Sequence, residues 1–256
     1  MLWREYINMR GKKVLQLFVF SVPLVLIVFL LFNSYTVQNK ERIAEQNKNY
    51  AEDAMRQKAK QVVGELENGV RIINAYAYFF NDSLTDDSIP TQTLAEIERN
   101  SVFDTIRFTD AEGITHFSDG RTVNSADRDY YARGMQGESG ISVLFDERLT
   151  DEETRLVFFA PVRMNGKIVG IVRGSYLAEQ YMKEILRTTY FGEPATTWLC
   201  MPDGRVIASS DDQDYGEENL LDFLVSSGEI DQGTEEAAKA VFENGGEGAF
   251  ICGENS

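Results

Sequence analysis

Histidine and cysteine are both scarce in this chain of 256 residues, and their scarcity limits the chemistry that it can carry. His116 is the single histidine, and Cys200 and Cys252 are the two cysteines. No G-x-S-x-G, P-loop or H-E-x-x-H motif occurs, so the common nucleophile, phosphate and zinc arrangements are missing. We therefore expect no catalytic residue, no metal site and no cofactor, and we expect this chain not to be an enzyme.

Basic residues are also few outside the N-terminus. The first 13 residues hold four bases and one acid, whereas residues 40–256 hold 21 bases and 40 acids, a net charge of −19. Nucleic-acid binding needs clustered Lys and Arg, so this charge argues against such a partner. The 16 Phe, 11 Tyr and 2 Trp are too many for a disordered acidic tail. The sequence therefore predicts a folded acidic body.

One long apolar run lies near the N-terminus. Within Val14–Tyr35, 17 of 22 residues are apolar, which is enough to cross a bilayer as a helix. The alternative is a cleaved signal peptide, but such apolar regions are shorter and precede an A-x-A-like cleavage site, which is missing here. The bases before the run predict a cytoplasmic stub at 1–13, a membrane helix at 14–35 and an extracytoplasmic body. We expect a single-pass protein of the inner (cytoplasmic) membrane, in contact with the lipid bilayer.

Residues 36–80 predict a long stalk helix. The stretch has no proline, and the apolar residues Ala51, Met55, Val62, Leu66 and Ile73 are separated by four, seven, four and seven positions. Such a seam favours a homodimer through this helix. A solvated stalk is the alternative.

After the helix, a strand, a turn with Asp and Gly, and a second strand occur twice. The first copy is 104–118 and the second 196–209, which predicts an α+β fold with antiparallel sheets, built from two copies of one unit.

Outside these hairpins, the pattern predicts a capping box at 93–96, a hairpin of strands at 155–162 and 167–175, and a helix at 177–186. After the second copy it predicts helices near 220–226 and 234–243 and a strand at 248–252. The second copy of the unit has fewer strand signals, so we expect it to be truncated. Cys200 and Cys252 both fall in it, and the sequence leaves their pairing open.

The best binding candidate is the segment from Asp127 to Gly134. If it is helical from Asp127, Arg128 and Tyr131 lie on one face, where a guanidinium and a phenol could hold a carboxylate. The alternative is a structural arginine with tyrosines in the core. His116 beside Ser118 and Asp119 could form a relay, although a partly packed hairpin histidine is the simpler interpretation.

These features together resemble the double Cache sensor regions of bacterial transmembrane receptors. The resemblance is carried by the N-terminal span, the long helix, DTIRFTDAEGITHFSDG, SADRDYYARGMQGESGIS, VFFAPV, GKIVGIVRGSY and TTWLCMPDGRVIASS. It implies two PAS-like modules, a membrane-distal one at 81–188 and a membrane-proximal one at 189–256. The distal module would hold a small-molecule ligand, and Arg128, Tyr130 and Tyr131 would line the pocket. Amino-acid-binding members place an aspartate where this chain reads Arg173-Gly-Ser175, so Arg173 would favour an anion such as a carboxylate.

The resemblance also implies that an output domain follows in the natural protein. A diguanylate cyclase or a sensor histidine kinase is the first expectation, and a chemotaxis signalling domain the second. The rival functions are a membrane-tethered adhesion or scaffold protein and a tethered extracytoplasmic hydrolase.

Overall fold

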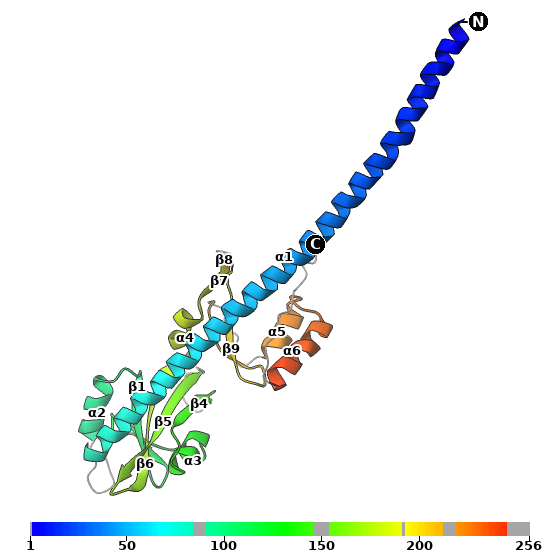
Figure 1. Cartoon of the computed structure of the whole chain (residues 1–256). Coiled ribbons are helices and arrows are strands. Elements are labelled where there is room, and N and C mark those ends of the chain that lie inside the picture. Colours follow the sequence, from blue (N-terminus) through cyan, green and yellow to red (C-terminus); the bar gives the residue numbers. More distant parts are fainter. Residues whose placement is uncertain (1, 84–90, 146–153, 191–192, 212–218, 245–256) are drawn as a thin grey trace. The chain divides into compact units, whose positions relative to one another are not determined.

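The computed structural model describes residues 2–83, 91–145, 154–190, 193–211 and 219–244. The chain divides into two compact units, Met1–Asp53 and Ala54–Ser256. The helix α1 (Leu2–Ser83) runs through the first unit and into the second (Figure 1). The predicted stalk helix at 36–80 is therefore present as part of one continuous helix.

The first unit consists of the N-terminal part of α1. Among the described residues, no helix has both the length and the apolar character that a membrane crossing requires. Most of the predicted membrane segment falls at residues 14–29, whose side chains lie outside the described ones. The described apolar residues that follow, Leu30, Leu31 and Phe32, are 62%, 66% and 67% exposed.

The second unit is built on a six-stranded antiparallel sheet in the order β3-β2-β1-β6-β5-β4 (Figure 1). Its strands are β1 (Thr105–Asp110), β2 (Ile114–His116), β3 (Thr122–Asn124), β4 (Gly140–Leu144), β5 (Arg155–Met164) and β6 (Lys167–Leu177). The predicted hairpins are confirmed, including the tight β5–β6 turn. There Asn165 and Gly166 take φ values of 52° and 79°, as a two-residue hairpin turn requires. The sequence predicted no strand at β3, which is short and exposed.

Strand alternation separates two apolar faces of this sheet. Phe158 and Val172 pack in the cluster that contains Ile73 and Phe80 of α1. Phe159 packs in a second cluster on the other face, beneath α3 (Asp129–Met135). The two helices therefore cover opposite faces of one sheet, since neighbouring residues of a strand point to opposite sides.

The predicted seam of α1 packs largely within its own chain. Val62 is 6% exposed and Ile73 is fully buried, and Leu66 packs against the same core cluster. Met55 is 41% exposed. The seam positions from Val62 onward therefore pack on the sheet, whereas Met55 does not.

Two further helices flank the sheet. The predicted capping box at 93–96 is found inside α2 (Thr91–Arg99), which begins two residues before it. The helix α4 (Ala178–Leu186) follows β6 directly, close to the predicted bounds of 177–186.

The remaining described residues form two hairpins and two helices. These are β7 (Thr188–Tyr190) with β8 (Glu193–Ala195), β9 (Trp198–Cys200) with β10 (Val206–Ser209), α5 (Leu220–Ser226) and α6 (Gln232–Asn244). The predicted second hairpin and both helices are present. The strand expected at 248–252 and Cys252 lie outside the described residues. A complete second PAS-like module thus remains a prediction.

Candidate functional site

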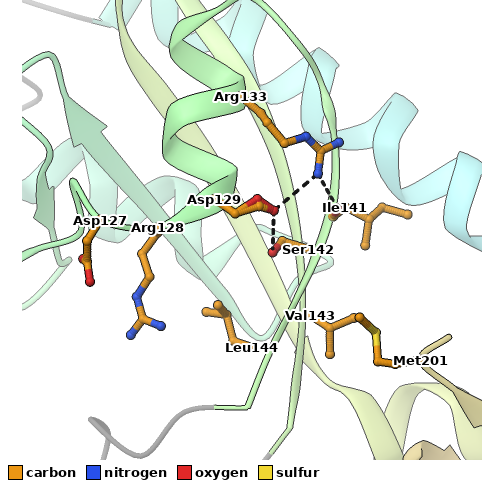
Figure 2. Close-up of a pocket in the computed structure, with 9 residues that line it drawn as sticks. All are labelled: Asp127, Arg128, Asp129, Arg133, Ile141, Ser142, Val143, Leu144 and Met201. Carbon is orange, nitrogen blue, oxygen red and sulfur yellow. Dashed lines mark hydrogen bonds and ion pairs between the residues drawn. The ribbon is translucent and has the colours of Figure 1, made fainter. Parts of the chain in front are cut away.

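A pocket of about 680 Å³ lies beside the start of α3 and the strand β4 (Figure 2). Its lining residues are Asp127, Arg128, Asp129, Arg133, Ile141, Ser142, Val143, Leu144 and Met201. It is within the usual size range for a small-molecule site. One of the four sequence-predicted site residues, Arg128, lines it.

The segment before α3 is anchored to the first hairpin. Ser125 is 4% exposed, and its Oγ accepts a hydrogen bond of 2.9 Å from Thr115 Oγ1. Its backbone N–H donates to the carbonyl of Gly113 at 2.8 Å. The Ser125 carbonyl in turn accepts from the N–H of Arg128 at 3.0 Å. The backbone of Arg128 is therefore held against the sheet, because each link to the hairpin is a short hydrogen bond.

Arg128 is the N-cap residue of α3 and has extended backbone angles, φ −82° and ψ 138°. The prediction that Arg128 and Tyr131 share one helix face was therefore wrong, since α3 begins at Asp129. Arg128 has no acceptor with which to cap the helix, and its side chain extends away from the start of α3 (Figure 2). This places its guanidinium at the pocket, while Tyr131 is outside the lining.

Arg133 ties α3 to β4 at the pocket wall. Its Nη1 donates to the Ile141 carbonyl at 3.3 Å and lies 3.5 Å from Asp129 Oδ2. Its Nε donates to Glu138 at 3.0 Å, and this hydrogen bond is the main cause that raises the pKa of Arg133. The guanidinium also lies 5.0 Å above the ring of Phe159. These contacts hold the spacing between α3 and the edge of the sheet.

Tyr130 and Arg173 lie together beneath α3 and not in the pocket lining; Tyr130 is in the core and Arg173 is half-buried. Tyr130 is 1% exposed, and the guanidinium carbon of Arg173 is 5.5 Å from its ring centroid. Arg173 faces Arg107 directly across the β1–β6 pair, an arrangement that repels. Glu98 of α2 offsets it by pairing with Arg107.

Tyr131 contacts the β1–β2 turn. Its hydroxyl donates to the carbonyl of Ala111 at 2.7 Å. Burial, followed by the charges of Asp110 and Glu112, raises the pKa of Tyr131 and so favours the protonated donor. Tyr131 thus fixes α3 to the hairpin.

His116 pairs with Asp110 at 2.7 Å, whereas Asp119 pairs with Arg121 and Ser118 contacts Glu98. The relay of His116 with Ser118 and Asp119 is therefore not formed. No group of three His, Cys, Asp or Glu side chains suited to a metal gathers in the described part of the chain.

The predicted segment Asp127–Gly134 contains Arg133, but no role was predicted for this residue, and β4 was not predicted as part of the site. The spacing of Asp129 and Arg133 by four positions was a usable signal for a pair on one helix face. The contribution of β4 to the pocket could not be predicted from the sequence, because it depends on the order of the strands in the sheet.

Comparisons with known proteins agree on the fold. No protein-family model matches the chain, and no curated protein matches its sequence. Solved structures do match. One is the ligand-binding domain of the Pseudomonas aeruginosa PAO1 amino acid chemoreceptor PctC in complex with GABA, and its sequence identity is 17% and its TM-score 0.52. The match covers 69% of this chain and 81% of that one.

A second match is the ligand-binding domain of the Pseudomonas fluorescens chemoreceptor CtaA in complex with L-valine. It has 16% identity and a TM-score of 0.53, and covers 70% of this chain and 81% of that one. These domains are Cache-type extracytoplasmic sensor domains. The chain therefore has the Cache sensor fold, as its sequence predicted.

Proposed function

We propose that this chain is the extracytoplasmic small-molecule sensing region of a membrane signal-transduction receptor. The single observation that carries the proposal is a Cache-type sensor fold in which an arginine, Arg128, lines a pocket of ligand size. The output domain, a diguanylate cyclase or sensor histidine kinase first and a chemotaxis domain second, would lie outside this chain.

The proposed ligand is a small carboxylate. An arginine fork binds a carboxylate through two parallel hydrogen bonds, which suits Arg128. GABA and L-valine, bound by the two matched chemoreceptor domains, both carry a carboxylate. In this proposal Arg128 contacts the ligand directly, Tyr130 and Arg173 support α3 from the core, and Tyr131 holds α3 to the hairpin.

The proposed location is the cell membrane, with the body outside and the N-terminus in the cytoplasm. The support is the apolar run Val14–Tyr35 and the bases that precede it.

A homodimer through α1 is also proposed, supported by exposed apolar residues such as Ile43 and Met55, which are 54% and 41% exposed. A second Cache module at 189–256 completes the proposed organisation, and its support is the β9–β10 hairpin.

A thermal-shift screen tests this function. The purified chain is heated with a panel of small organic acids and amino acids, and so are two variants, Arg128→Ala and Arg99→Ala. Arg99 is an exposed arginine at the end of α2 and serves as the matched control. We expect at least one carboxylate to raise the melting temperature of the wild type and of Arg99→Ala but not of Arg128→Ala. Equal shifts in all three proteins would contradict the role of Arg128.

A further inference from the structure

The strand β4 forms an edge of the sheet and one wall of the pocket. β4 pairs with β5 on one side only, and no other described strand pairs with it. Ile141 to Leu144 all line the pocket and are half-buried. A ligand in this pocket therefore meets the outer side of an edge strand, where no described strand pairs with the backbone N–H and C=O groups.

The direction of these backbone groups follows from Arg133. Its guanidinium donates to the carbonyl of Ile141, so that carbonyl points away from β5 and toward α3. In an antiparallel edge strand, residues two apart turn their backbone groups to the same side. Val143, two residues on, thus presents its N–H and C=O to the pocket beside Ile141.

The charged groups of the pocket have both signs. Arg128 supplies a guanidinium, and Asp127 and Asp129 supply carboxylates at the start of α3 (Figure 2). A guanidinium has five N–H donors, so existing contacts of Arg128 leave it able to bind a carboxylate as well. A matching ligand combines a carboxylate and an ammonium group with amide groups between them.

We propose that the pocket binds a short peptide with a free C-terminal carboxylate, which adds to β4 as an extra strand. Main-chain hydrogen bonds to Ile141 and Val143 would supply affinity, and Arg128 would bind the carboxylate. The volume of about 680 Å³ accommodates more than a single small residue. This inference rests on the proposed sensing function and names the ligand class of the same site.

Calorimetric titration of the full chain with four probes tests the inference from the ligand side. The probes are trialanine, trialanine C-terminal amide, trialanine methylated on both of its amide nitrogens, and L-alanine. Trialanine is expected to bind at least about tenfold more tightly than each of the others, because each lacks a hydrogen bond or ion pair. Equal affinity of trialanine and L-alanine, or no effect of methylation, overturns the proposal.

Two variants test the inference from the protein side. Val143→Pro removes one outward N–H, and proline is tolerated on the exposed side of an edge strand. We expect Val143→Pro and Arg128→Ala each to weaken trialanine binding about tenfold or more, and Arg99→Ala to leave it unchanged. Unchanged binding in Val143→Pro overturns the proposal, and if that variant does not fold, the methylated peptide on wild-type protein still decides.

Failure of the peptide inference is distinguishable from failure of the proposed function. If organic acids bind in an Arg128-dependent way and no peptide binds, the inference fails and the sensing function stands. If neither organic acids nor peptides bind, both fail.

Discussion

Gly69 of α1 lies directly against the ring of Phe158 on β5. A Cβ atom at this position would be 2.7 Å from Cδ1 and 2.8 Å from Cζ of that ring. An aromatic ring in a packed core has little room to shift, so the absence of a side chain sets how closely α1 approaches the sheet. Gly134 plays the same part for α3, because a Cβ there would be 2.5 Å from Cγ2 of Ile171.

Gly69→Ala is therefore expected to destabilise the second unit by about 1–3 kcal/mol through overpacking. Gly64→Ala is the matched control, since Gly64 is in the same helix and has no neighbouring atom within 4 Å of the added Cβ. There the change should stabilise by about 0.5–1 kcal/mol through helix propensity. Chemical denaturation of both variants measures the free energy of unfolding. A stabilising Gly69→Ala would show that α1 does not pack on Phe158 as described.

Tyr176 and Tyr181 stack with their ring centroids 4.1 Å apart. Burial, followed by the neighbouring Tyr181, raises the pKa of Tyr176 from 10.0 to about 12. The folded state thus keeps a proton that the unfolded state releases, and the free energy of unfolding should fall as pH rises from 10 to 12.

Tyr176→Phe should reduce this loss of stability at high pH, because the phenylalanine side chain has no hydroxyl proton to release. Tyr78→Phe is the control, since Tyr78 is 76% exposed. Denaturation curves at pH 9, 10 and 11 measure the dependence. The same pH dependence in Tyr176→Phe and the wild type would be inconsistent with the raised pKa.

At the scale of elements, the C-terminal end of α4 is held by a lysine of α1. Lys58 Nζ donates to the carbonyls of Ile185 at 2.6 Å and Arg187 at 2.8 Å. The last carbonyls of a helix have no partners within it, and a cation there also interacts favourably with the helix dipole. Because α4 directly follows β6, this contact links the strand that carries Arg173 to α1.

Lys58→Met should cost about 1.5–3 kcal/mol, the usual contribution of a hydrogen bond that involves a charged group. Lys60→Met is the matched control, because Lys60 is exposed on the same helix and the change should be within about 0.5 kcal/mol. Hydrogen exchange is expected to show faster exchange at the end of α4 in Lys58→Met alone. Equal exchange rates in both variants would contradict the role of Lys58 in holding the end of α4.

At the scale of the whole molecule, much of the second unit was predictable from sequence. The strand β1 alternates apolar and polar residues, β5 and β6 are short apolar runs, and their turns carry Gly or Asn-Gly, so local pattern was sufficient. The strand β3 was missed because Thr122–Asn124 is short and fully exposed, and such a strand has no apolar alternation.

The candidate site was only partly predictable, and the reason is physical. Arg128 was identified from its neighbours in sequence. Tyr130 is buried and Arg173 is half-buried beneath α3, where core packing and ligand contact produce the same residue types. The pocket wall formed by β4 depends on the position of that strand at the sheet edge, and strand order is set by tertiary contacts. The local sequence pattern therefore located α3, but it did not identify β4 as the strand with which α3 forms the pocket.

The central claim is that a small carboxylate binds at Arg128. Isothermal titration calorimetry of the most stabilising acid from the thermal-shift screen, with wild-type, Arg128→Ala and Arg99→Ala proteins, tests it most directly. We predict saturable 1:1 binding to the wild type and to Arg99→Ala, and a loss of about tenfold or more in Arg128→Ala, since a carboxylate loses its charged partner. Equal affinity in all three proteins would contradict the claim.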